Sequence, residues 1–221
     1  MHFELHLLPP AAAPWIMLVA AVLLGFAMPG LKALRGHPER LHLVLGSAVA
    51  LAVLWSVSAR VDPGISVHVL GTPLVTLLLG WRLALVAAAL AELALMLFGT
   101  SAPGAASLSW LLSAALPAAV SYGVARAARF RLPRNPFIFI FVCGFFGAAA
   151  SLLATWLVAA ALLGLAGQPL PSGDGASLWA FLPLVLFPEA FINGALASMF
   201  IVYRPDWVRL YDERFYARGA H

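Results

Sequence analysis

The chain begins Met1-His2, and this start carries the donor groups of a metal chelate. A free α-amine, the backbone nitrogen of residue 2 and the His2 imidazole can close fused rings around one ion. One position in the plane then remains, and an imidazole such as that of His68 can fill it. Four nitrogens in a plane suit Ni(II) and Cu(II), and by extension low-spin Co(II), whereas Zn(II) sites are more often tetrahedral. The alternatives are a flexible tail for His2 and a core role for His68, and spacing alone leaves both open.

The chelate requires Met1 to be the true N-terminus. The stretch from Met1 to His6 contains no Lys or Arg, so the positive region of a secretory signal is missing. A bulky His2 should also protect Met1 from removal, and we expect the encoded start to be the mature one. Because binding displaces protons from the amine and the amide, metal affinity should fall at low pH.

A few other ionisable groups stand outside the basic loops. His6 is an additional ligand, a residue of the entry path, or a solvated or packing residue. Glu92 and Glu189 lie inside long apolar runs, where ionisable residues are costly and are candidates for function. Each carboxyl can instead make a hydrogen-bonded contact between helices, and two carboxylate ligands would favour a harder, octahedral site. Three further histidines are interpreted as unrelated to the site: His37, His42 and His221.

No enzyme motif is present in the sequence. It has no nucleotide-binding loop, no Ser/His/Asp order of an esterase and no HExxH. We therefore expect no catalytic residue, no organic cofactor and, if transport requires energy, an ATPase on another chain. The single Cys143 lies in an apolar run, which excludes a disulfide framework and fits a buried small hydrophobe.

The composition is that of an integral membrane protein. Hydrophobic residues make up 63% of the chain and charged residues only 10%, against about a quarter charged residues in soluble domains. The net charge of +4 does not indicate nucleic acid, because the basic residues sit in short clusters between apolar runs, as cytoplasmic loops do.

The apolar runs predict an all-α transmembrane bundle of about seven helices. Each run approaches the roughly 17 to 25 residues that a spanning helix needs. The candidates are 14–34, 41–59, 66–81, 83–99, 108–125, 137–165 and 178–203. The third is short and follows Asp62-Pro63-Gly64, so it is expected to be partly re-entrant, with His68 one turn inside its outer end. Small residues in 144–151 and 194–198 predict close helix packing.

We expect one domain, 1–221, with an outward metal-binding segment at 1–13, the bundle at 14–203 and a cytoplasmic tail at 204–221. The orientation follows from the positive-inside rule. One side of the bundle receives twelve basic residues: Lys32, Arg35, Arg40, Arg82, Arg126, Arg129, Arg131, Arg134, Arg204, Arg209, Arg214 and Arg218. The other side receives only Arg60. The N-terminus is therefore predicted to be outside and the C-terminus cytoplasmic.

Several segments together resemble the CbiM/NikM proteins, the substrate-specificity subunits of energy-coupling-factor (ECF) transporters for cobalt and nickel. They are Met1-His2, Gly64-Ile65-Ser66-Val67-His68-Val69-Leu70-Gly71, Pro188-Glu189-Ala190-Phe191-Ile192-Asn193-Gly194 and Arg204-Pro205-Asp206. The resemblance implies a seven-helix fold with the N-terminal segment tucked into the bundle, in a bacterial inner membrane. It implies binding of Co²⁺ or Ni²⁺ by the Met1 amine, the amide and imidazole of His2, and His68.

The resemblance also implies partners: a transmembrane coupling subunit, a pair of ATPases and often a small accessory membrane subunit. The chain departs from the family in two places. Where the family begins Met-His-Ile-Pro-Asp-Gly, this chain has Phe3-Glu4-Leu5-His6, and the Asn-bearing segment of the family appears as 107–111 without amides. These departures leave metal preference open, including Cu²⁺ or zinc. A permease for another metal and a non-transporting membrane interaction or assembly protein remain alternatives.

Overall fold

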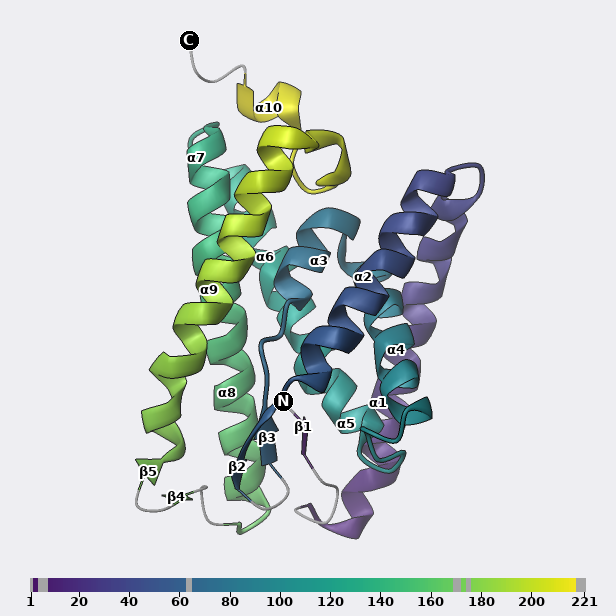
Figure 1. Ribbon diagram of the computed structural model, residues 1–221, viewed down its shortest axis with the longest axis vertical. Coiled ribbons are helices and arrows are strands. Elements are labelled where there is room, and N and C mark those ends of the chain that lie inside the picture. Colours follow the sequence, from purple (N-terminus) through teal and green to yellow (C-terminus); the bar gives the residue numbers. More distant parts are fainter. Residues whose placement is uncertain (1, 4–7, 63–64, 169–171, 174–175, 218–221) are drawn as a thin grey trace.

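The computed structural model describes residues 2–3, 8–62, 65–168, 172–173 and 176–217, and it consists mainly of helices (Figure 1). The helices are η2 (Pro10–Ala12), α1 (Ala13–Ala27), η3 (Met28–Leu34), α2 (Pro38–Ser56), α3 (Thr72–Leu79), α4 (Trp81–Leu97), α5 (Ala106–Trp110), η4 (Leu111–Ala115), α6 (Leu116–Arg131), α7 (Pro136–Ile138), η5 (Phe139–Phe146), α8 (Gly147–Leu165), α9 (Leu178–Tyr203), η6 (Pro205–Trp207) and α10 (Glu213–Ala217). The strands are β1 (His2–Phe3), β2 (Ala59–Asp62), β3 (Ile65–Val67), β4 (Ser172–Gly173) and β5 (Ala176–Ser177).

Five helical segments of the described chain are long and apolar enough to cross a bilayer. They are Pro10–Leu34, Pro38–Ser56, Ala106–Arg131, Pro136–Leu165 and Trp179–Tyr203. With α4 and the short α3, these segments make the helical bundle that the apolar runs predict. The chain is a multi-pass membrane protein, which explains why large apolar side chains such as Phe26 and Leu184 are exposed on its outer surface.

The two ends of the bundle differ in charge. Figure 1 shows α7, α10 and the junction between η3 and α2 at one end, and all five strands at the other. Arg35 and Arg40 flank the junction between η3 and α2, Arg134 precedes α7 and Arg214 lies in α10. These basic residues therefore gather at the first end.

The third candidate span is wrong as a helix over 66–81. Within this range only α3 and Trp81, the first residue of α4, are helical. The residues before α3 form β3 and a non-helical connection at 68–71, called the extended link below. Gly71 has φ +67, and a Cβ added there would lie 2.7 Å from Leu54 Cδ2. The chain therefore turns at a position that favours glycine, and α3 begins beyond it with Pro73 in its first turn.

The extended link is tolerated at this depth because protein surrounds it. His68 and Leu70 of the link are buried, and so is every residue of α3, which packs against α2, α4, α6 and α9. Non-helical backbone inside a bilayer needs such cover, together with partners for its polar groups. Part of this requirement is met by a small antiparallel sheet in which β3 lies between β1 and β2.

The segment after α9 closes the opposite end of α3. The backbone N–H groups of Arg209 and Leu210 donate to the carbonyls of Leu78 and Leu77, each at 3.1 Å. These bonds satisfy carbonyls that the end of a helix leaves without intrahelical partners.

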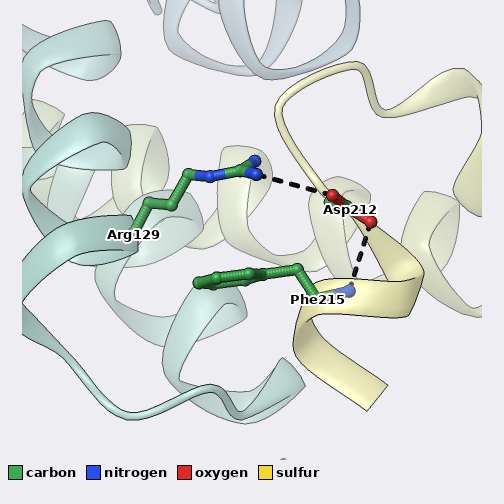
Figure 2. A network of polar contacts seen from close by, with 3 residues as sticks. All are labelled: Arg129, Asp212 and Phe215. Atoms are coloured by element: carbon green, nitrogen blue, oxygen red, sulfur yellow. Dashed lines mark hydrogen bonds and ion pairs between the residues drawn. The ribbon is translucent and has the colours of Figure 1, made fainter. Parts of the chain in front are cut away.

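An aromatic and charged cluster holds the remainder of this segment. Asp212 lies 3.5 Å from Arg129 and accepts the Phe215 N–H at 3.2 Å, while the Phe215 ring lies under the Arg129 guanidinium (Figure 2). Tyr216 is buried beside Phe139, and burial raises the pKa of its phenol to about 12. The phenol therefore stays neutral at physiological pH.

Close helix packing occurs where η5 meets α9, as the small residues predict. A Cβ added at Gly144 would lie 3.3 Å from Gly194 Cα, and one added at Gly194 would overlap the Phe145 ring. We expect Gly194→Ala to lower stability by about 1–3 kcal/mol, because Phe145 must move out of a packed position. Thermal unfolding of the purified protein in detergent measures the change.

The matched control for Gly194→Ala is Gly25→Ala in α1. A Cβ added at Gly25 meets nothing within 4 Å, so this variant should be as stable as the parent or slightly more stable, since Ala favours helix. Equal losses in both variants would contradict the packing argument.

Candidate metal-binding site

His68 lies in the extended link between β3 and α3, and its side chain is 3% exposed. Its Nδ1 is 3.0 Å from the carbonyl oxygen of Val69. Because a carbonyl can only accept a hydrogen bond, Nδ1 carries the proton and Nε2 presents the lone pair. In this tautomer Nε2 is the nitrogen that can bind a metal, while the Nδ1–H donates to a backbone carbonyl, an arrangement common for metal-binding histidines.

Trp55 of α2 flanks the imidazole and also fixes the link. The two ring centroids are 5.5 Å apart and tilted by 42°. The Trp55 indole N–H donates to the Leu70 carbonyl at 2.8 Å. One side chain therefore limits the rotation of the His68 ring and satisfies a backbone acceptor two residues further along.

Ser113 also lies beside the His68 imidazole. Its Oγ lies 3.5 Å from His68 Nε2, and its carbonyl accepts the Thr72 hydroxyl at 2.7 Å. Ser113 belongs to η4, a π-helical stretch, and such stretches are frequent at functional sites. The Ser113 carbonyl is available to the Thr72 hydroxyl because the residue four positions later, Pro117, has no backbone N–H to donate to it.

Glu189 and Asn193 of α9 hold the residues that follow His68. The Glu189 carboxylate accepts the backbone N–H groups of Leu70 and Gly71, and Asn193 Oδ1 accepts the Leu74 N–H at 2.9 Å. The Asn193 amide in turn donates to Glu189 Oε1 at 2.8 Å. Both side chains are fully buried. Helix α9 therefore satisfies the backbone donors around the start of α3.

The strand β1 brings the start of the chain to this link. It pairs antiparallel with β3, with His2 opposite Ser66 and Phe3 opposite Ile65, and it also contacts α5. Antiparallel pairing directs the N-terminal end of β1 toward the C-terminal end of β3. His68 follows that end of β3 directly.

The predicted site residues fall into two groups. His68 is buried at the end of β3 and the backbone of His2 is in β1, whereas Met1 and His6 lie outside the described residues. His68 is in the extended link, not one turn inside a helix as the sequence analysis expects, because the helix starts after Gly71. Among the described residues, no three His, Cys, Asp or Glu side chains come together as a metal cluster.

The two intramembrane carboxyls have different surroundings. Glu189 is hydrogen-bonded, as one of the two roles considered for it expects, but its partners are the backbone before α3 and Asn193 of its own helix and not a second helix. Glu92 accepts the Ser101 hydroxyl at 2.6 Å, so its partner belongs to a loop and not to another helix. It has no contact with His68 among the hydrogen bonds of the described residues.

Three residues of the site were missed by the sequence analysis: Trp55, Ser113 and Asn193. Asn193 had a usable signal, because it stands four residues after Glu189 and therefore on the same helix face. Neither Trp55 nor Ser113 carries such a signal, since a tryptophan or a serine in an apolar run is common in membrane helices.

The fold and the site define a polytopic membrane protein whose N-terminal strand lies next to a buried, oriented imidazole. The chain belongs to the family described as the cobalt uptake substrate-specific transmembrane region, which matches residues 2–207. This match confirms the resemblance seen in the sequence and makes the chain a membrane component of transition-metal transport. The family is one of transporter components and not of enzymes.

Two solved structures share the fold. A crystal structure of a transition metal transporter is similar with a TM-score of 0.72 and 19% identity, over 93% of each chain. A structure of a truncated transition metal transporter gives a TM-score of 0.70 and 18% identity, over 93% of this chain and 99% of the other. Among curated protein sequences, none matches the chain.

Proposed function

We propose that the chain is the substrate-binding membrane component of an ECF-type uptake transporter for a divalent transition metal, cobalt or nickel. The ion is bound as cargo by the Met1 α-amine, the backbone nitrogen and imidazole of His2, and Nε2 of His68. Four nitrogen donors in one plane suit Ni(II) and low-spin Co(II), and Cu(II) is the strongest competitor by the general order of metal affinities.

The register of β1 against β3 supports this proposal most strongly. His2 pairs with Ser66, and His68 stands two residues further along the chain, directly after the end of β3. The pairing therefore brings the start of the chain to the segment that carries His68. The protonated Nδ1 of His68 leaves the other ring nitrogen as the donor.

The orientation and the partners belong to the same proposal. Twelve of the thirteen basic residues fall on the side of the C-terminal segment, which supports a cytoplasmic C-terminus and an outward N-terminal strand in a bacterial inner membrane. Because the sequence contains no nucleotide-binding loop, ATPases on separate chains and a transmembrane coupling subunit are the expected partners.

Replacement of the buried imidazole tests the proposal. We expect His68→Ala to weaken binding of Ni(II) and Co(II) by more than the roughly 10–100-fold that loss of an outer-shell partner costs. Calorimetric titration of the purified protein with Ni(II), Co(II), Cu(II) and Zn(II) measures the affinities and their order.

The matched control is His42→Ala, which removes an exposed histidine of α2. This variant should bind as tightly as the parent. Wild-type affinity in His68→Ala, with thermal unfolding unchanged in both variants, would show that the ion is held elsewhere.

A further inference from the structure

A long apolar groove runs along the side of the bundle between α1, α4, α6 and α8. Its volume is about 760 Å³, within the range of ligand cavities. The lining is almost wholly apolar and includes Trp15, Val19, Leu85, Leu112, Ala119 and Leu162. Trp15, Val19 and Ala119 are exposed, so the groove opens to the surroundings of the bundle.

A second hollow continues this groove toward the end that carries the C-terminal segment. It has a volume of about 300 Å³, and the two hollows share Trp81 and Tyr122 as walls. Aromatic residues of this kind are enriched where a bilayer meets water. Beyond them the lining changes to the guanidinium-bearing side chains of Arg82 and Arg209.

Close chain packing brings the two arginines together. Gly80 has φ +77, and a Cβ added there would lie 3.4 Å from Arg209 Cδ. A Cβ added at Gly30 of η3 would lie 2.9 Å from Arg82 Cβ. Three segments distant in sequence therefore meet at this hollow: η3, the turn between α3 and α4, and the residues after α9.

The two guanidinium groups lack acidic partners in the described chain. Arg82 lies over the Trp81 ring, 5.2 Å from its centroid, and Arg209 donates to the Leu79 carbonyl at 3.3 Å. No carboxylate of the described residues is within ion-pair distance of either group. Arg129 at the same end contrasts with them, because Asp212 is its ion-pair partner (Figure 2).

We infer that the groove and this hollow together form a binding site for one anionic phospholipid. The acyl chains occupy the apolar groove, and the phosphate lies at the level of Trp81 and Tyr122 between Arg82 and Arg209. An amphiphile with an apolar tail and an anionic head matches the order of the lining, which runs from the apolar groove past Trp81 and Tyr122 to the two arginines. Guanidinium groups bind phosphate oxygens through charge-assisted hydrogen bonds. The inference does not depend on the metal proposal.

Native mass spectrometry of the purified full chain in detergent tests the site. We expect the protein to retain one dioleoyl-phosphatidylglycerol in preference to dioleoyl-phosphatidylethanolamine by roughly thirtyfold, the factor expected from two guanidinium groups near a lipid surface. The double variant Arg82→Ala/Arg209→Ala should retain both lipids equally. Ala119→Trp, which fills the groove, should weaken retention of both lipids.

The matched control is the double variant Arg126→Ala/Arg204→Ala. It removes the same charge from the same end, where the two side chains lie over the rings of Phe130 and Trp207, and it should keep the preference. If the control loses the preference for phosphatidylglycerol to the same extent, the lipid is attracted by the general positive charge of this end and the proposed site is wrong.

Three results in the wild-type protein would also overturn the inference, whatever the variants do. Equal retention of the two lipids would remove the role of the arginines. Displacement of phosphatidylglycerol by inorganic phosphate at equal concentration would make the hollow a site for free phosphate. Retention of neither lipid would leave the groove to a helix of a partner protein.

Discussion

A chain extended by three residues before Met1 is expected to bind Ni(II) and Co(II) about 10²–10⁴-fold more weakly than the native chain, although both histidines remain. The proposed chelate uses an amine, an amide nitrogen and an imidazole that are joined by a few covalent bonds. When the amine is moved away, the remaining donors bind the ion as separate ligands. The increase in affinity that comes from joining the donors in one chelate is then lost. Calorimetric titration of both proteins under the same conditions measures the difference.

An extension by a single residue is an informative control and not a repeat of the same test. It would make His2 the third residue, so that the amine, two amide nitrogens and the imidazole fill all four in-plane positions. Such a chain should still bind Ni(II) and Cu(II), but His68→Ala should no longer weaken binding. If the chain extended by three residues keeps native affinity, the N-terminal amine is not a ligand and the chelate is wrong.

Helices of this protein are largely predictable from sequence because each needs only a local run of apolar residues. The last expected span, 178–203, coincides with α9, and 137–165 differs by one residue from the span Pro136–Leu165. The exception is 66–81. A short apolar run cannot distinguish a buried helix from a buried extended segment, since both present the same hydrophobicity.

The small sheet next to His68 could not be predicted from local sequence patterns. Its strands β1, β2 and β3 come from the first residues and from both sides of the turn after α2. With only two to four residues, these strands are too short to show a clear period-2 pattern, and their pairing depends on the helices that position their ends. The proposal that His2 and His68 share one metal site therefore comes from metal chemistry and a family resemblance, whereas the register that pairs β1 with β3 required the fold.

In the proposed function, the non-helical backbone before α3 serves to present the His68 imidazole to the metal ion. A helix through 66–81 would use its own backbone groups and bury His68 among side chains of one turn. The extended link instead presents the imidazole at the end of β3, next to the start of β1. Its cost is a set of backbone donors and acceptors that a bilayer cannot satisfy. Trp55 accounts for one of these acceptors, and Glu189 accounts for two donors.

Glu189→Ala is therefore expected to lower stability by about 2–4 kcal/mol, because it leaves the N–H groups of Leu70 and Gly71 without an acceptor. Side-chain hydrogen bonds between membrane helices are typically worth only about 0.6 kcal/mol, since the separated helices find other partners. The loss of about 2–4 kcal/mol applies to Glu189→Ala because the two donors are backbone N–H groups of a non-helical link. Unlike helical N–H groups, they have no backbone carbonyl of their own segment to bond to. Thermal or denaturant unfolding in detergent measures the loss.

The same substitution should weaken metal binding by about 10–100-fold, as loss of a partner that orients a ligand does, without removing any proposed ligand. Glu189→Gln keeps the volume of the side chain but removes its charge and one of its two acceptor oxygens. The remaining oxygen of the glutamine can accept one backbone N–H, whereas its amide nitrogen would face the other N–H. We expect its loss of stability and affinity to be close to that of Glu189→Ala.

Ser198→Ala on the same helix is the matched control, because the Ser198 hydroxyl donates to the Gly194 carbonyl of its own helix. This variant should keep both the stability and the affinity of the parent. If Glu189→Ala keeps native metal affinity while its stability falls, the carboxylate supports the fold but does not orient His68. In that case Trp55 and Ser113 are the groups that fix the imidazole. Substitutions of those two residues should then weaken metal binding.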